Sequence, residues 1–270
     1  MPKRLRYRLA RILYNYESHS THGIELVVPL LGDGLACSIN TKDIIGWCIF
    51  FFGEYEKGTN HVLAEYVKKG HVVLELGANL GSETLIVSRL VGSEGHVYGF
   101  EPNPYTFKRL QRNIEINGIS NVDIYELAIG ENNTEIYFNI YPENSSNPGM
   151  SSKYVENPCT KKINVKQVTI DSFMQQHNIT KLDFLKLDIQ GAEIDALNGA
   201  RNTIAKYRPI IFAEAYSEEQ VAHNHTQQMY DMLMAYGYKI FLIEDNNLIS
   251  LASGPVDGNW LAKQDRPRNT

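Results

Sequence analysis

From about residue 61 onward, short apolar runs alternate with amphipathic segments. The apolar runs predict strands at 72–76, 96–100, 122–127, 135–140, 165–169, 184–189, 210–213, 238–243 and 248–251. Apolar residues at helical spacing predict one helix that ends near residue 67 and four more at 82–92, 104–117, 192–207 and 217–236. Ser82 is the predicted N-cap of the helix at 82–92. Strands that alternate with amphipathic helices are typical of a parallel sheet covered on both faces. The pattern therefore predicts an α/β fold.

Two stretches depart from this alternation. In the first 60 residues, Leu5, Leu9, Ile12 and Leu13 predict a helix, and β-like pieces follow at 24–29 and 35–39. We therefore divide the chain into an N-terminal cap at 1–60, an α/β domain at 61–255 and a C-terminal tail at 256–270. The second stretch, 142–162, is rich in Asn, Ser and Pro and has no periodicity, which predicts a long loop. Such a loop is either a lid or binding loop, or an ordinary surface insertion.

Composition and charge narrow the class of protein. Hydrophobic residues make up 43% of the 270 residues, enough for a full globular core, and the net charge is −5. This acidity argues against a protein that coats nucleic acid. The three cysteines have no CxxC spacing, which indicates neither a disulfide framework nor a zinc cluster and suits a reducing cytoplasm.

Membrane contact is considered at two places. The longest apolar run, 44–52, is too short to span a bilayer. The basic start of the chain is either a contact for a membrane surface or acidic partner, or a solvated helix face. We expect no transmembrane segment, and peripheral contact through the basic N-terminus stays open. The sequence leaves the oligomeric state undetermined.

The strand at 72–76 runs into a glycine turn, in the sequence from Glu75 to Gly81, ELGANLG. Gly77 and Gly81 allow a sharp turn and let a ligand lie against the backbone. A second acid, Glu101, ends the next strand about one βα unit later. An acid at that place can accept two hydrogen bonds from a ribose diol. The pair of signals predicts a nucleoside-containing ligand.

The turn does not match a dinucleotide site. The pyrophosphate fingerprint is G-x-G-x-x-G, whereas the middle glycine position here is Asn79, and the turn contains no Arg or Lys. An NAD-dependent oxidoreductase is therefore the weaker alternative. A non-catalytic cofactor-binding relic of the fold is a second alternative.

The E-x-G-x-x-x-G spacing resembles motif I of class I S-adenosylmethionine-dependent methyltransferases. Further motifs narrow this to a resemblance to the FkbM family: GEYE at 53–56, FEPNP at 100–104, RN at 112–113 with NG at 117–118, FLKLDIQGAE at 184–193, and RP at 208–209 before Glu214. Two departures stand out. Glu75 replaces the more usual Asp, and Gln190 replaces a carboxylate in the D-x-E-G motif.

The resemblance implies a Rossmann-like fold with a seven-stranded, mostly parallel sheet, in which the hairpin at 239–251 supplies an antiparallel strand. It implies S-adenosylmethionine as the cofactor, with the glycine loop beside its methionine part and the acid of the second strand on its ribose. It also implies O-methylation of a glycan or glycosylated metabolite, as in surface polysaccharide or natural-product biosynthesis. A planar amine such as DNA adenine is not expected as the acceptor, since no N-P-P-Y motif follows the Asp188 strand, and the net acidity argues against nucleic acid in general.

Catalysis is assigned to acids at strand ends. A sugar hydroxyl is a poor nucleophile and needs a base or a metal to remove its proton. Asp188 ends one central strand, and Glu214 ends the next if the strands pair as predicted. We hypothesise that one of them is the general base, or that the pair holds a divalent cation, although no dedicated metal site is predicted. The alternative is that these acids cap helices or pair with Lys186, which we include among the catalytic candidates.

The remaining candidates follow the motifs. The residues predicted to bind the cofactor are Glu75, Gly77, Ala78, Asn79, Gly81, Glu101, Pro102, Asn103, Glu126 and Ala128. The residues predicted to contact the substrate are Tyr55, Ser151, Ser152 and Gln190.

Overall fold

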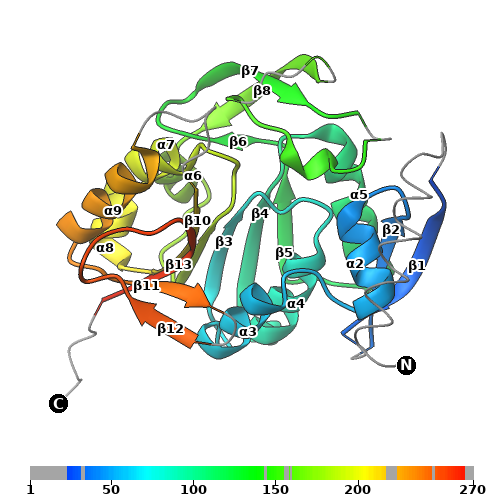
Figure 1. The fold of residues 1–270 in the computed structure, drawn as a ribbon, viewed down its shortest axis with the longest axis horizontal. Coiled ribbons are helices and arrows are strands. Elements are labelled where there is room, and N and C mark those ends of the chain that lie inside the picture. The colour runs from blue at the N-terminus through cyan, green and yellow to red at the C-terminus, as the bar shows by residue number, and fades with distance from the viewer. Residues whose placement is uncertain are drawn as a thin grey trace.

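The computed structural model describes residues 23–31, 34–142, 145–154, 158, 160–216, 224–244 and 247–264 (Figure 1). The helix predicted near Leu5 lies outside the described residues. The centre of the molecule is a sheet of strands in the order β12-β11-β13-β10-β9-β3-β4-β5. Its middle is parallel. These parallel strands are β3 (Val72–Leu76), β4 (His96–Phe100), β5 (Val122–Tyr125), β9 (Phe184–Leu187) and β10 (Ile210–Ala215).

One end of the sheet is antiparallel and differs from the expectation in the number of strands. The strand beside β10 is β13 (Gly258–Lys263), and β11 (Lys239–Glu244) and β12 (Asn247–Ser250) lie outside it. The described sheet thus has eight strands rather than seven. The 239–251 hairpin supplies antiparallel strands as expected, and the additional antiparallel strand β13, which lies between β11 and β10, comes from the segment expected to be a C-terminal tail. Trp260 and Leu261 in β13 are fully buried, because their side chains enter the two cores on opposite faces of the sheet.

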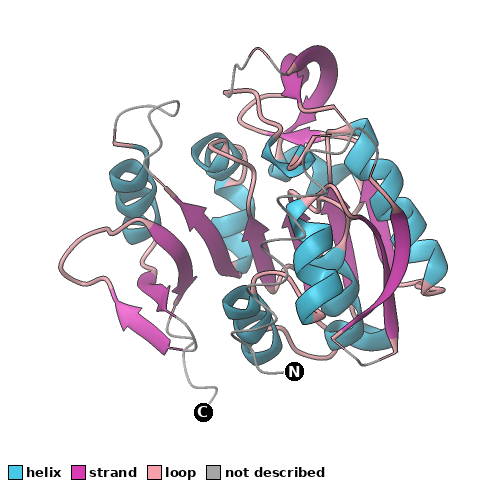
Figure 2. Ribbon diagram, turned by 45° about the vertical axis from the view of Figure 1, so that its right-hand side comes forward, coloured by secondary structure: helices cyan, strands magenta, loops and turns pink. Residues whose placement is uncertain are grey.

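Helices cover both faces of this sheet (Figure 2). Because neighbouring strand residues point to opposite faces, Val73 and Phe184 enter one core, whereas Leu74 and Leu185 enter the other. The first core contains residues of α3 and α4, and the second contains residues of α6 to α9. The helices are α3 (Lys57–Tyr66), α4 (Ser82–Val91), α5 (Pro104–Ile116), α6 (Ile170–Gln176), α7 (Glu193–Asn198), α8 (Arg201–Tyr207) and α9 (His225–Ala235), with a 3-10 turn η1 (Gly92–Glu94).

Two helix predictions differ in detail. The single helix expected at 192–207 is divided into α7 and α8 around Gly199, where the chain passes so close to Gly130 that a Cβ would lie 2.1 Å from the Gly130 carbonyl oxygen. The N-cap of α4 is Gly81 rather than Ser82, because the chain enters the helix with a left-handed residue, φ 90°.

The N-terminal part folds against the main domain. A hairpin of β1 (Glu25–Leu30) and β2 (Leu35–Asn40) precedes α2 (Ile44–Phe52), a helix that the apolar run did not predict. The side chain of Asp43 caps this helix. The amide of Asn113 in α5 accepts from the Ser38 backbone and donates to the Leu80 carbonyl, so it joins the hairpin to the start of α4.

A small sheet stands over the carboxyl ends of the parallel strands (Figure 1). It consists of β6 (Ala128–Ile129), β7 (Thr134–Ile140) and β8 (Lys161–Val168), and the 3-10 turn η2 (Pro148–Met150) lies in the loop between β7 and β8. Apart from this 3-10 turn, the described residues of the unperiodic stretch before Lys161 form neither helix nor strand, in agreement with the predicted loop. Among the described residues, no helix combines the length and apolar character needed to cross a membrane.

Candidate active site

A cavity of about 290 Å³ lies at the carboxyl ends of the parallel strands, beneath the small sheet. In an open α/β sheet this is the edge where ligands bind. Residues from β3, β4 and β10, from the turn after β9, from the β7–β8 loop, and from the segment before α3 line it. Elements far apart in the sequence therefore meet at a single cavity.

The glycine loop after β3 forms one wall. Gly77 has φ 81°, and a Cβ on it would lie 1.8 Å from the carbonyl oxygen of Asp188, so only glycine fits there. The backbone N–H groups of Gly77 and Ala78 donate to the carbonyl of Phe100, which ties the loop to the end of β4. Asn79 also has a left-handed backbone, φ 51°, and its buried Oδ1 has no hydrogen-bond partner.

Glu101 joins this loop to the start of α5. Its carboxylate accepts from the backbone N–H of Asn79 (2.9 Å) and from that of Asn103 (2.8 Å). Burial raises the pKa of Glu101 to about 7. The Asn103 side chain caps α5 and donates to Ser151 Oγ and to the Pro148 carbonyl, so the same corner also anchors the β7–β8 loop.

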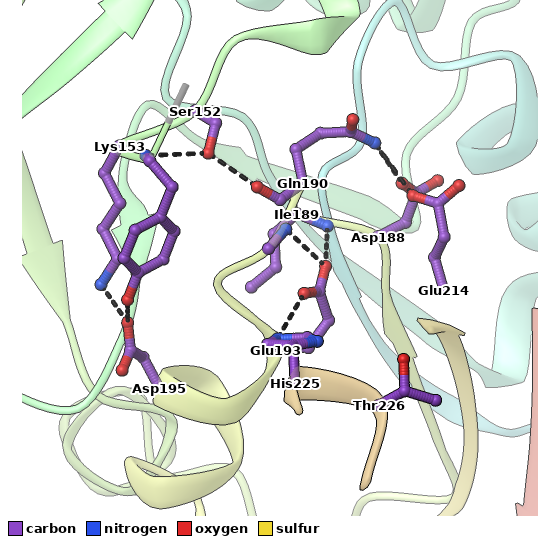
Figure 3. A network of polar contacts seen from close by, with 12 residues as sticks. Ser152, Lys153, Asp188, Ile189, Gln190, Glu193, Asp195, Glu214, His225 and Thr226 are labelled. Carbon is purple, nitrogen blue, oxygen red and sulfur yellow. Dashed lines mark hydrogen bonds and ion pairs between the residues drawn. The ribbon is translucent and has the colours of Figure 1, made fainter. Parts of the chain in front are cut away.

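Asp188 and Glu214 come together as expected, and Gln190 bridges them (Figure 3). The Gln190 amide nitrogen donates to Asp188 Oδ1 (3.2 Å) and to Glu214 Oε2 (2.9 Å). Gln190, which replaces the carboxylate of the family's D-x-E-G motif, is thus the residue that connects Asp188 to Glu214. A third carboxylate at the same place would add like charge, whereas the amide supplies a donor to both.

Lys186 forms ion pairs with Asp188 and with a further acid, Glu83. Its buried Nζ lies 3.0 Å from Asp188 Oδ2 and 2.7 Å from Glu83 Oε2. Burial alone would raise the pKa of Asp188, but the charge of Lys186 and the hydrogen bonds from Glu214, Lys186 and Gln190 together lower it below its ordinary value. Burial and the charge of Asp188 raise the pKa of Glu214 well above its ordinary value. Asp188 is therefore ionised while Glu214 holds a proton.

The turn that carries Gln190 is fixed by Glu193, a residue that the sequence did not single out. Its Oε1 accepts from the backbone N–H of Ile189 (3.0 Å) and of Gly191 (3.3 Å), and its Oε2 lies 3.4 Å from His225 Nε2. From the other side, Ser152 Oγ donates to the Gln190 carbonyl (2.7 Å) (Figure 3). These contacts hold Gln190 at its left-handed φ of 53°.

The structure places the predicted site residues in two groups. Those that line the cavity are Tyr55, Gly77, Asn79, Glu101, Pro102, Ala128, Ser151, Asp188, Gln190 and Glu214. Those outside its lining are Glu75, Ala78, Gly81, Asn103, Glu126, Ser152 and Lys186. Most of the second group supports the first: Glu75 is buried in β3, Gly81 begins α4, and Ser152 holds the Gln190 turn. Glu126 is exposed, and its neighbour Leu127 lines the cavity instead.

The lining residues that the sequence did not single out include Glu56, Glu193 and Tyr216. Glu56 belongs to the GEYE motif that carried the resemblance, so its position was available as a signal. Glu193 stands in the motif that contains Asp188. Tyr216 lies two residues after Glu214 and belongs to none of the motifs that carried the resemblance, so no signal in the sequence pointed to it.

The order and direction of the central strands, with the cavity at their carboxyl ends, are those of a Rossmann-like α/β fold. The family model of the methyltransferase FkbM domain matches residues 75–240. The chain therefore belongs to the FkbM methyltransferase family, which excludes the oxidoreductase alternative. The cofactor of this family is S-adenosylmethionine.

Similar proteins include methyltransferase 1 of Beauveria bassiana, 28% identical over 47% of this chain and 57% of that protein. The hexuronic acid methyltransferase AglP of Haloferax volcanii is 24% identical over 58% of this chain and 61% of that protein. The 2-O-methyltransferase NoeI of Sinorhizobium fredii is 25% identical over 57% of this chain and 66% of that protein. The matches thus span less than two thirds of each relative.

Among solved structures, an FkbM methyltransferase from Methylobacillus flagellatus is similar. It is 19% identical with a TM-score of 0.47, and the match covers 71% of this chain and 43% of that one.

The residues at the cavity fit S-adenosylmethionine. Asn79 Oδ1 is a buried acceptor with no partner, as required for the ammonium group of the cofactor. Glu101 is a carboxylate placed for a ribose diol. Leu127, Ala128 and Ile129 supply an apolar wall next to Glu101, which suits an adenine ring. Among the described residues, no group of three or more His, Cys, Asp or Glu side chains is arranged to hold a metal.

Proposed function

We propose that this protein transfers the methyl group of S-adenosylmethionine to a hydroxyl of a glycan or glycosylated metabolite. The observation that carries the proposal is the Asp188–Gln190–Glu214 cluster, which opens into the cavity beside the glycine loop. The cluster supplies an ionised carboxylate, Asp188, next to a protonated carboxyl group, Glu214, in the part of the cavity that we assign to the acceptor. The names of the relatives AglP and NoeI, a hexuronic acid methyltransferase and a 2-O-methyltransferase, support a sugar acceptor.

The strand order supports two adjacent half-sites. Glu101 follows β4, the glycine loop follows β3, Asp188 follows β9 and Glu214 lies near the end of β10, and these strands are consecutive neighbours. Neighbouring strands lie about 4.8 Å apart. A cofactor on the β4–β3 side therefore meets an acceptor on the β9–β10 side within one strand spacing. This arrangement allows the in-line geometry that methyl transfer needs.

When bound, S-adenosylmethionine supplies an electrophilic methyl group on a sulfonium. Asp188 accepts the proton of the attacking hydroxyl, since Lys186 keeps Asp188 ionised and Gln190 orients it. Glu214, which holds a proton, donates a hydrogen bond to a neighbouring oxygen of the acceptor rather than acting as the base. Of the two acids proposed from the sequence, the geometry thus favours Asp188 as the base.

The proposal is tested with methyl-labelled S-adenosylmethionine and a panel of glycosides, with products analysed by NMR and mass spectrometry. We expect new O-methyl signals on a sugar ring. In parallel, calorimetric titration should show that S-adenosylmethionine and S-adenosylhomocysteine bind and that NAD does not. Methylation of nitrogen or carbon alone contradicts the proposal. Cofactor binding without transfer to any acceptor supports the relic alternative instead.

A further inference from the structure

A buried histidine that the mechanism does not use lies next to the turn that carries Gln190. His225 begins α9 and is 3% exposed, and among the described residues neither of its ring nitrogens has a hydrogen-bond partner. Its Nε2 lies 3.4 Å from Oε2 of Glu193, just beyond the length of a well-formed hydrogen bond (Figure 3). Buried polar groups without partners are rare in folded proteins. Because Glu193 is within ion-pair distance, we take it as the partner of His225.

The packing of two helices brings these side chains together. Glu193 begins α7, and His225 begins α9. Ala196 and Leu197 of α7 belong to the same buried core as Met229 of α9. A close-packed core holds the elements that form it at fixed positions. The core therefore sets the separation of the two helix starts, and with it the contact between Glu193 and His225.

The two carboxyl oxygens of Glu193 have different partners. Oε1 accepts from the backbone N–H of Ile189 (3.0 Å) and of Gly191 (3.3 Å), so both of its lone pairs are used, whereas Oε2 faces His225. Burial raises the pKa of Glu193 to about 7. A proton on Glu193 must then lie on Oε2 and point to the imidazole, and an ionised Glu193 can accept a proton donor at the same oxygen.

A neutral imidazole suits both forms of Glu193. Burial lowers the pKa of His225 below its ordinary value, although the charge of Asp195 in α7 acts in the opposite direction. One nitrogen of a neutral imidazole donates a hydrogen bond and the other accepts one, in either of two tautomers. Nε2 can therefore accept from a protonated Glu193 or donate to an ionised one. In both cases one proton lies between Nε2 and Oε2, and Oε1 stays on the backbone of the turn.

The turn needs such support because Gln190 has a left-handed backbone, φ 53°. A residue other than glycine keeps that conformation only where its surroundings enforce it. We propose, on the basis of the function proposed above, that His225 is a positioning residue for methyl transfer. Through Glu193 it holds the turn that keeps the Gln190 amide between the two acids of the site. His225 does not line the cavity and acts only through this contact.

Amide hydrogen exchange, followed by NMR, tests the proposal without any acceptor. His225→Leu removes both ring nitrogens and leaves an apolar side chain in the buried position. We expect the backbone N–H groups of Ile189 and Gly191 to exchange about three- to ten-fold faster in this variant, the factor that corresponds to loss of one neutral hydrogen bond. In His225→Gln the rates should stay within about two-fold of the unaltered protein, since an amide group also donates or accepts.

Thr226→Val is the matched control at the same helix start. Thr226 is buried and does not line the cavity, and its Oγ1 donates to Asp257 Oδ1 (2.8 Å). Both Thr226→Val and His225→Leu should lower the thermal midpoint, which also confirms that the variants fold. We expect faster exchange at the two amides of the turn only in His225→Leu. Equal exchange in the two variants would mean that His225 stabilises α9 in general, and overturns the proposal.

Kinetics with an accepted glycoside test the effect on transfer. We expect His225→Leu to lower kcat about ten-fold and to change the affinity for S-adenosylmethionine by less than about two-fold, because only the β9–β10 side of the cavity, which we call the acceptor half, depends on the turn. In a Glu193→Leu background, the turn has already lost the group through which His225 acts, so His225→Leu should lower kcat little further. Additive losses overturn the route through Glu193.

The two kinds of measurement separate this proposal from the proposed function. Faster exchange in His225→Leu, together with no transfer to any hydroxyl, contradicts the methyl transfer proposed above but supports the hold of His225 on the turn. O-methyl transfer that His225→Leu leaves as fast as before, with unchanged exchange, supports the proposed function and overturns the positioning role.

Discussion

The two halves of the cavity are built in different ways. On the β3–β4 side, backbone geometry defines the site: Gly77 leaves no room for a Cβ, and Glu101 binds two backbone N–H groups. On the β9–β10 side, the site is a set of coupled side chains in which Gln190 and Lys186 set the charge of two acids. The comparison teaches that the cofactor half tolerates little change in shape, whereas the acceptor half depends on the balance of charge.

The sharpest test of this difference is Asp188→Asn. We expect kcat to fall by about 10²-fold or more, since loss of a general base costs that much, while affinity for S-adenosylmethionine changes only a few-fold. Steady-state kinetics and calorimetry measure the two quantities. If cofactor affinity falls as much as kcat, Asp188 belongs to the cofactor half and the division is wrong.

The reciprocal change is Gly77→Ala in the cofactor half. The new Cβ would lie 1.8 Å from the Asp188 carbonyl oxygen at a φ of 81°, so we expect the free energy of unfolding to fall by about 2 kcal/mol or more, with loss of cofactor binding. Gly118→Ala is the control, because Gly118 also has a positive φ (61°) but open space around it. Chemical denaturation that shows equal losses in the two variants would mean that backbone conformation, not the close approach, requires glycine at 77.

A smaller effect is expected for Glu101→Gln. Gln retains one acceptor oxygen, so the loop is held by one hydrogen bond of the two and the ribose loses a charged partner. We expect cofactor affinity to fall about ten-fold, since a hydrogen bond to a charged group contributes roughly 1.5 kcal/mol or more. Calorimetry at a fixed pH provides the measurement. An unchanged affinity would remove Glu101 from the cofactor site.

The smallest expected effect is on the pH dependence of stability. Burial raises the pKa of both Glu75 and Glu101 from 4.5 to about 7. The native state therefore binds more protons than the unfolded state between these values, and this contribution to stability, complete below pH 4.5, is lost as the pH rises through 7. We expect the thermal midpoint of the ligand-free protein to fall by a few degrees from pH 5 to pH 8, and less in Glu75→Gln. A midpoint that rises over this range contradicts the prediction.

Much of the central domain was predictable because its strands are buried on both faces and read as short apolar runs. Strands β3 and β4 match their predicted bounds, 72–76 and 96–100. β13 was not predicted, because six residues after a Gly- and Pro-containing stretch carry no period, and only pairing with β10 and β11 makes them a strand. The same reason explains α2, whose uniform apolar run has no helical period.

The site residues also divide into those that local sequence predicted and those that depend on tertiary contacts. Acids and glycines at strand ends were found from their spacing, since carboxyl ends of parallel strands share one edge of the sheet. The roles of Gln190 and Glu193 were not readable, because each depends on a contact with a distant group, Glu214 and His225 respectively. The pairing of Asp188 with Lys186, in contrast, was one of the alternatives that the sequence offered. Lys186, predicted as a catalytic residue, lies outside the cavity lining and holds Asp188 in place.

The sequence by itself determined the α/β class, the glycine loop, the pair of acids and the family resemblance, because these depend on periodicity and local spacing. Only the tertiary structure decided that Gln190 joins Asp188 to Glu214, that Glu56 and Tyr216 enter the same cavity, and that β13 completes the sheet. The physical reason is that charge coupling and burial arise between residues that are distant in the chain and adjacent only after folding.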